Sequence, residues 1–181
     1  MKKILTFLLA FILLFLVATS HIALADELKD GLYSYRAGEY NTAYRLLSPL
    51  AIQGNSAAQV LLGIMFEKGQ GVAKNYKEAV KWYQLSATVG NAVAQNRLGQ
   101  IFEKGLGLPK NGEEAFKWYR LSADQGYALS QLFLGKSFYL GQGVQQDYKE
   151  AFKWFELSAE QGLEDAQYNL GLMYYLGQGV Q

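Results

Sequence analysis

NSAAQVLLGIMFEKGQGVAKNYKEAVKWYQLSATVG, residues 55–90, sets the pattern for most of this 181-residue chain. The same 36-residue pattern returns from residue 91 and from residue 127, and it begins a fourth time at residue 163. The residues that keep this step are Gly63, Gly99, Gly135 and Gly171, together with Trp82, Trp118 and Trp154. A fixed period of this length is typical of stacked supersecondary units, each too small to bury its apolar face alone.

Each unit contains two stretches with the spacing of an amphipathic helix, separated by a glycine-bearing loop. In the first unit the residues that share a helical face are Ala58, Leu62, Met65 and Phe66 before the loop, and Ala79, Trp82, Tyr83 and Ala87 after it. We name the two helices of a unit helix A and helix B. The pattern predicts an all-α fold, an α-solenoid of stacked antiparallel helix pairs.

The recurring glycines and tryptophans have mechanical interpretations. Gly69 and its equivalents in later units are predicted to end helix A, since glycine adopts a left-handed conformation without steric cost. A glycine inside helix A costs about 1 kcal/mol relative to alanine, which indicates that helix A and helix B cross too closely there for a side chain. The G-x-G spacing of the loop lacks the G-K-[ST] ending of a phosphate-binding loop. We interpret the tryptophans as core between units.

Residues 1–25 are predicted to be a signal peptide. The chain starts with Lys2 and Lys3, continues with an apolar run over residues 4–18, and carries small residues before Asp26. The alternative is an uncleaved anchor, because the run could be extended toward the length of about 20 residues that spans a membrane. We therefore expect an exported protein, periplasmic or secreted, with no membrane contact after cleavage.

The pattern divides the rest of the chain into an N-terminal hairpin, three complete units and one incomplete unit: 26–54, 55–90, 91–126, 127–162 and 163–181. The last helix A has no helix B after it to cover Leu170, Met173 and Tyr174. Terminal units of solenoids normally carry a polar cap. We expect either a chain that continues beyond Gln181 or self-association through this uncapped helix.

Composition restricts the possible functions. Lys2 and Lys3 are two of the 17 basic residues, so 15 basic and 16 acidic residues follow the predicted signal peptide. This near balance, with no basic tract, argues against binding to nucleic acid or to an anionic membrane surface. His21 is the one histidine and the chain has no cysteine, so the mature chain has no imidazole base, thiolate nucleophile or Cys/His zinc site. We predict a non-enzyme with no catalytic residue, metal or cofactor.

The recurring motif A-x-x-L-G-x-x-F/Y-x-x-G-x-G-V, followed by Y-K-E-A-x-K-W-Y/F-x-x-S-A-x-x-G, resembles the Sel-one-like repeat family, which is related to the tetratricopeptide repeat. The resemblance covers residues 55–181, and residues 27–54 look like a shorter tetratricopeptide-type hairpin. It implies an α-solenoid that assembles other proteins; bacterial exported members are often linked to signalling, envelope polysaccharide control or host contact. The chain departs from the cysteine-rich branch, to which penicillin-binding or β-lactamase activity is attributed, and it has no S-x-x-K motif.

A binding surface is expected where the units differ, on the concave face of helix A. By analogy with tetratricopeptide grooves, the residues predicted to contact a protein or peptide partner are Asn96, Gln100, Leu132, Lys136, Tyr139, Tyr168 and Tyr175. This series changes from polar to aromatic along the stack, which suits a peptide or helix held in a groove. The alternative is that these residues are only solvated, or are buried by the adjacent unit.

The leading functional prediction is an exported scaffold or adaptor without enzymatic activity. One alternative is an envelope enzyme acting on glycan through paired carboxylates such as Glu67 and Glu103, or an enzyme that interacts with penicillin. Those two carboxylates are copies of one repeat position, which suits a scaffold better than an acid and a nucleophile with different roles. A second alternative is a structural spacer that oligomerises.

Overall fold

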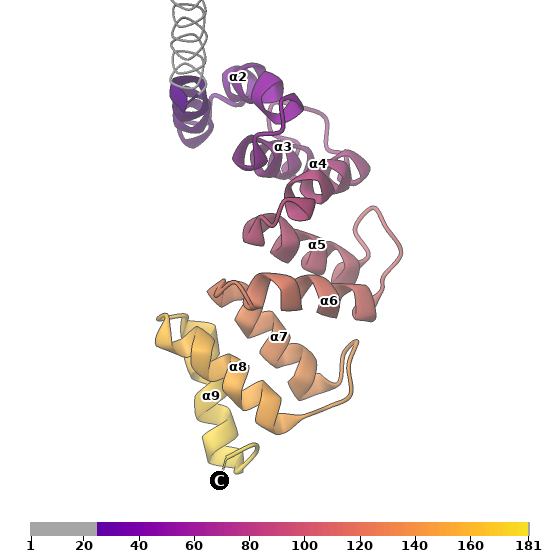
Figure 1. The fold of residues 1–181 in the computed structure, drawn as a ribbon, viewed down its shortest axis with the longest axis vertical. Helices are drawn as coiled ribbons and strands as arrows, with labels where there is room; N and C mark the ends of the chain where they lie inside the picture. The colour runs from indigo at the N-terminus through magenta and orange to yellow at the C-terminus, as the bar shows by residue number, and fades with distance from the viewer. Residues whose placement is uncertain (1–24, 181) are drawn as a thin grey trace, which may run out of the picture.

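The computed structural model describes residues 25–180, and this part of the chain contains nine helices and no strand (Figure 1). Residues 25–36 form the first helix. The others are α2 (Tyr40–Ile52), α3 (Ser56–Lys68), α4 (Tyr76–Thr88), α5 (Ala92–Lys104), α6 (Gly112–Ala123), α7 (Ala128–Leu140), α8 (Tyr148–Glu160) and α9 (Glu164–Leu176). The predicted all-α solenoid is confirmed. The predicted signal peptide lies outside the described residues, apart from its last position.

The helices follow one another along the long axis of the molecule, as Figure 1 shows. The extensive helix–helix contacts from α2 onward all join consecutive helices, so each pair packs on the pair before it and the pair after it. Three hydrophobic clusters succeed one another along this line. The core is therefore distributed along the stack, as expected of units that depend on their neighbours.

Local sequence explains where the helices begin and end. Asn75 and Asp147 precede helix B of their units, and each side chain accepts hydrogen bonds from two backbone N–H groups of the first turn. Gly69 ends α3 in the predicted left-handed conformation, with φ of 73°. Its equivalents at the ends of α5, α7 and α9 have the same conformation. Capping residues therefore account for the start of α4 and α8 and for the end of every helix A.

The glycine inside helix A marks a close crossing, as predicted. A Cβ atom at Gly99 would lie 2.5 Å from Cδ1 of Tyr119, and one at Gly135 would lie 2.6 Å from Cδ1 of Phe155. A Cβ atom at Gly171 would meet nothing within 4 Å, since no helix B follows α9 in the described residues. The crossing therefore explains three of these four glycines.

The second glycine of each loop lies against the preceding unit. A Cβ atom at Gly71 would lie 2.6 Å from the carbonyl oxygen of Tyr40, and one at Gly107 would lie 2.6 Å from Cβ of Tyr76. Tyr40 and Tyr76 are the first residues of α2 and α4. The loop after helix A thus rests on the start of helix B in the unit before it.

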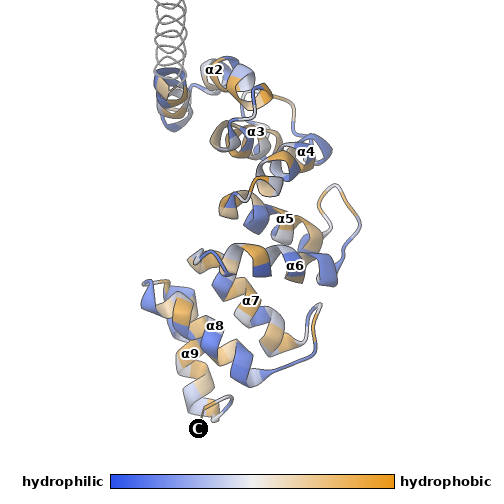
Figure 2. Cartoon of the chain, viewed as in Figure 1, coloured by the Kyte–Doolittle hydropathy of each residue, from blue (hydrophilic) through white to orange (hydrophobic). Residues whose placement is uncertain are grey.

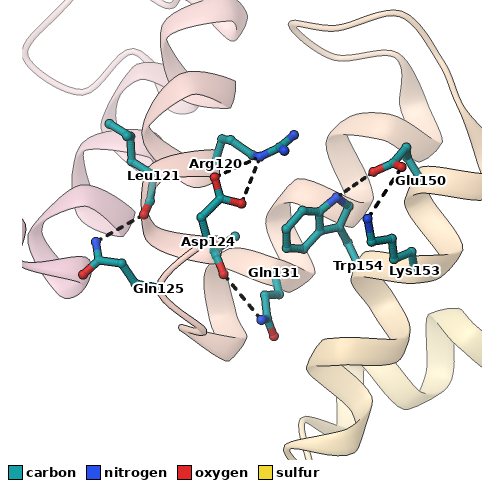
Figure 3. Close-up of polar contacts among 9 residues, drawn as sticks. Arg120, Leu121, Asp124, Gln125, Gln131, Glu150, Lys153 and Trp154 are labelled. Carbon is teal, nitrogen blue, oxygen red and sulfur yellow. Dashed lines mark hydrogen bonds and ion pairs between the residues drawn. The ribbon is translucent and has the colours of Figure 1, made fainter.

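The three tryptophans all contact the hydrophobic clusters, as predicted, but they are buried to different degrees. Trp154 is 5% exposed, whereas Trp82 and Trp118 are only partly buried. The guanidinium of Arg120 lies over the Trp154 ring, 5.4 Å from its centroid. The same guanidinium forms an ion pair with Asp124 (Figure 3). One unit earlier the residue equivalent to Arg120 is Gln84, which stands before Trp118 as Arg120 stands before Trp154. The largest fully buried rings are instead Tyr83, Tyr119 and Phe155.

Polar side chains form two recurring sets of hydrogen bonds that the sequence analysis did not identify, one within each unit and one between consecutive units. The hydroxyl of Ser122 donates to the Ala92 carbonyl at 2.7 Å, and Ser86 and Ser158 do the same in their own units. The amide of Gln59 donates to the Ala51 carbonyl at 3.0 Å, and Gln95, Gln131 and Gln167 repeat this bond. Figure 2 shows that hydrophobic and hydrophilic residues share each helix. These bonds give a partner to buried serine and glutamine side chains, which would be costly to leave unpaired.

Candidate partner-binding face

Two of the seven residues predicted to contact a partner are buried. Asn96 is 2% exposed and its amide donates to the Ser130 hydroxyl on the next helix A at 2.7 Å. Leu132 is 1% exposed and belongs to the hydrophobic cluster around Phe155. The expectation that these two lie on an open face is wrong, because their side of helix A packs against the following unit.

The exposure of Tyr168 is explained by the same packing of helix A against the following unit. Tyr168 occupies the repeat position of Asn96 and Leu132, yet it is 72% exposed because no further unit follows α9 in the described residues. Tyr174 and Leu176 are exposed on the same helix. Met173, which we expected to be uncovered, is fully buried, since it packs into the preceding unit's hydrophobic cluster.

The remaining predicted residues fall into two rows along the helices A. The first row lies one residue after the helix A glycine and contains Ile64, Gln100, Lys136 and Leu172, all partly exposed. The second row lies four residues after that glycine and contains Glu67, Glu103, Tyr139 and Tyr175, of which the last is 87% exposed and the others are partly exposed. We call these eight residues the helix A rows. All eight remain partly or fully exposed.

The first half of the helix A rows is acidic. Glu67 accepts a hydrogen bond of 2.6 Å from the Tyr83 hydroxyl and lies 4.0 Å from the Arg97 guanidinium. Glu103 accepts a bond of 2.8 Å from the Tyr119 hydroxyl. Position 133, equivalent to Arg97, is Phe133, whose ring stacks on Tyr119 at 5.0 Å.

Burial holds these two tyrosines in their protonated form. Burial is the largest cause that raises the pKa of Tyr83, followed by its hydrogen bond to Glu67. Burial also raises the pKa of Tyr119, followed by the charge of Glu103. A protonated hydroxyl donates to a carboxylate, so each tyrosine orients the acidic side chain of its own unit.

The second half of the helix A rows is aromatic. The Tyr139 ring packs against Tyr148 and Phe155, with centroids 5.3 and 6.4 Å apart, and its hydroxyl donates to Gln178 Oε1 at 3.0 Å. The Lys136 ammonium lies 5.7 Å from the centre of the Phe133 ring. In the first half, by contrast, Gln100 accepts a hydrogen bond of 3.3 Å from Arg97. The rows therefore offer carboxylates at one end and aromatic rings at the other.

A pocket of about 240 Å³ lies beside Glu103, between the second and third complete units. Its walls include Glu103, Gly112, Ala115, Tyr119, Ser137 and Gln142. Sequence reasoning missed it, although two small residues, Gly112 and Ser137, stand where other units carry large ones.

The described residues offer little for other kinds of site. Within residues 25–180 no three side chains of His, Cys, Asp or Glu gather in a way that could hold a metal ion. No helix in the same range has the length and apolar character needed to cross a bilayer. The arrangement can recognise side chains of a partner through carboxylates, aromatic rings and one small pocket.

Comparison with known proteins identifies the repeat family and the fold. The family model described as "Sel1 repeat" matches residues 56–91, 92–127, 128–163 and 164–181. The fold is similar to that of a Sel1 repeat protein from Oxalobacter formigenes, with 41% identity and a TM-score of 0.80 over 85% of this chain and 63% of that one. No curated protein sequence matches the chain.

Two further solved structures share the architecture. A protective antigen of uropathogenic Escherichia coli strains, which displays an SLR fold, is 34% identical with a TM-score of 0.82 over 87% of this chain and 34% of the antigen. Cysteine rich protein B of Helicobacter pylori is 19% identical with a TM-score of 0.60 over 72% of this chain and 96% of that one, a likeness of fold alone. This chain thus spans less than two thirds of the first two relatives.

Proposed function

Because the chain belongs to the Sel1 repeat family, whose members are generally non-enzymatic scaffolds for protein–protein interaction, we propose that it is an exported scaffold that binds a protein or peptide along the helix A rows. The observation that carries this proposal is the persistent accessibility of those rows. Every unit keeps a side chain partly or fully exposed at both positions, and in the first row the residues directly before and after Ile64, Gln100 and Lys136 are buried. A groove that is continuous across units suits an extended or helical peptide.

The chemistry of the rows describes the partner. Glu67 and Glu103 favour basic or hydrogen-bonding groups near the N-terminal units, and Tyr139 and Tyr175 favour apolar anchors near the C-terminal ones. Asn96 and Leu132 take no part, since both are buried. The proposed surface therefore has a direction, with polar contacts first and aromatic contacts last.

Export is supported by the basic start, apolar run and small residues of positions 1–25. Fractionation of the producing bacterium would test it. Protein found only in the cytoplasm would contradict export without affecting the scaffold proposal.

Site-specific photocrosslinking tests the proposed surface. A photoreactive residue placed at Gln100 or Lys136 should capture the same partner in the native cell, since these positions are one unit apart on one row. The matched control is Glu156, which is exposed on α8 and outside both rows. Equal capture from Glu156, or no capture from either row position, would contradict the proposal.

Self-association is a second candidate, favoured by the apolar side chains that α9 exposes. Replacing Tyr168 and Tyr175 with serine should abolish any concentration-dependent increase in mass measured by light scattering. A protein that remains monomeric at high concentration before the substitution would exclude this candidate.

A further inference from the structure

The pocket beside Glu103 exists because one unit departs from the others at two positions. The residue that begins helix B is Tyr40, Tyr76 and Tyr148 in three units, but Gly112 in the unit that forms the pocket. The residue two positions after the helix A glycine is Met65, Ile101 and Met173, but Ser137 at the pocket. Gly112 and Ser137 both line the open space. The pocket is therefore the place that a tyrosine and a neighbouring apolar side chain fill elsewhere.

The other units show how a tyrosine ring is held in this place. The Tyr40 ring packs edge-on to Tyr35, with centroids 5.5 Å apart, and its hydroxyl accepts a hydrogen bond of 2.8 Å from the Gln70 amide. The Tyr148 ring packs edge-on to Tyr139 at 5.3 Å, and its hydroxyl accepts a bond of 3.1 Å from Gln146. In both cases an aromatic ring and an amide hold the tyrosine.

The unit that contains Tyr76 is the closest template for the pocket. The ammonium of Lys74 lies 4.8 Å from the centre of the Tyr76 ring, and Glu67 stands four residues after the helix A glycine. The equivalents of Lys74 and Glu67 are Lys110 and Glu103, and both line the pocket. The lysine beside the pocket is thus the equivalent of the lysine that lies over the Tyr76 ring one unit earlier.

An amide is also in position to serve an incoming hydroxyl. Gln142 lines the pocket and occupies the repeat position of Gln70, which donates to Tyr40. Gln142 is exposed to solvent. At about 240 Å³ the pocket is smaller than the sites of roughly 300–1,000 Å³ that hold drug-sized molecules. Its size suits a single side chain.

We propose that this pocket receives a tyrosine side chain of the partner protein, in the place where the other units carry their own tyrosine. The ring lies on Ala115 and Ser137 with the Lys110 ammonium over its face, and the Gln142 amide donates to the phenol oxygen. Because Glu103 belongs both to the pocket and to the helix A rows, a partner lying along the rows passes the pocket. The inference deepens the proposed scaffold function and rests on it.

A probe that mimics the tyrosine side chain tests the pocket without knowledge of the partner. 4-Methylphenol is added to the ¹⁵N-labelled protein, and amide shifts are followed by NMR. We expect a saturable shift centred on Ser137 and Gln142. Butylammonium, which mimics lysine, should shift these amides at least tenfold less at equal concentration. Stronger binding of butylammonium, or no saturable shift with 4-methylphenol, would overturn the proposal.

Variants that fill or keep the pocket provide the control. Gly112→Tyr restores the tyrosine of the other units and should weaken 4-methylphenol binding at least tenfold, whereas Gly112→Ala should change it less than twofold. Ser137→Met fills the same space from α7 and should also abolish binding, so the test does not depend on one variant folding. Unchanged binding in a folded Gly112→Tyr or Ser137→Met protein would place the probe elsewhere and refute the proposal.

The two proposals fail separately. Loss of partner capture at the helix A rows with intact 4-methylphenol binding would overturn the scaffold function and leave a pocket that fits an aromatic ring. Intact capture together with absent probe binding would keep the scaffold function and overturn the tyrosine assignment.

Discussion

One substitution, glycine to alanine inside helix A, should have opposite effects at two equivalent positions. Gly99 and Gly171 occupy the same repeat position in α5 and α9. Alanine favours a helix interior over glycine by about 1 kcal/mol, so Gly171→Ala, which meets nothing within 4 Å, should stabilise the protein by about that amount. The favourable helix contribution is the same at Gly99, where the surroundings differ.

At Gly99 the new methyl group meets the Tyr119 ring at 2.5 Å. Overpacking a well-filled core costs about 1–3 kcal/mol. Moving the ring also weakens the hydrogen bond from Tyr119 to the Glu103 carboxylate, and a bond to a charged group contributes about 1.5–3 kcal/mol. After the gain in helix propensity, we expect Gly99→Ala to lower the free energy of unfolding by about 1–4 kcal/mol.

Urea unfolding followed by circular dichroism measures both effects. With a slope of about 1–3 kcal/mol per molar urea, the midpoint should fall by about 1 M for Gly99→Ala and rise slightly for Gly171→Ala. In the Gly99→Ala background, Tyr119→Phe should cost less than in the native chain, because the hydrogen bond is already weakened. Stabilisation by both alanines would refute the close crossing as the reason for the glycine.

Three further predictions concern the tyrosines, the tryptophans and export. The raised pKa of Tyr119 contributes stability that is complete below the ordinary tyrosine pKa of about 10 and is lost as the pH rises above it, so Tyr119→Phe should flatten the fall in urea midpoint between pH 9 and pH 11 relative to the exposed control Tyr175→Phe. Trp154→Ala should lower the free energy of unfolding by about 3–5 kcal/mol and Trp82→Ala by less, since Trp82 is only partly buried; equal losses in thermal unfolding would contradict this. N-terminal sequencing of the protein from the producing bacterium should find Asp26 first, and a sequence that starts at Met1 would favour the uncleaved anchor.

The sequence predicted the fold because each helix is specified locally. Apolar spacing, an asparagine or aspartate before helix B, and a glycine after helix A act within a few residues of one another. The glycine inside helix A was equally informative. A residue that opposes the helix and still recurs has to be offset by packing, and Gly99 against Tyr119 shows that packing.

The sequence predicted the binding face less well, because burial between units depends on how far each pair rotates relative to the next. Asn96 and Leu132 are buried against the following unit. The residue pattern of a single helix does not show which of its sides will pack against the next unit. The tryptophans differ for a related reason. Arg120 helps to cover Trp154, whereas Gln84 precedes Trp118, so identical residues reach different burial through a neighbour 34 positions earlier.

Other features were visible in the sequence but carried no distinctive residue type. Gln59 and its three equivalents keep the period of the glycines, yet glutamine is common on solvated surfaces and its hydrogen bond to the preceding unit follows only from the stacking. The sign of the pocket in the sequence was the presence of Gly112 and Ser137 where other units carry larger residues. Small residues in place of large ones become meaningful once the structure shows that both positions face the same space.

Each loop packs on the helix B of the preceding unit, so the contacts between units repeat along the stack. Gly71 and Gly107 meet the first residue of the helix B one unit back, so every joint repeats with the period of the sequence. Duplicating or excising one whole period leaves each new junction with matching surfaces. The joint between Gly143 and Gly112 is the exception, since there two glycine backbones meet. Duplication of the other units would therefore lengthen the protein and leave one unit that carries the pocket.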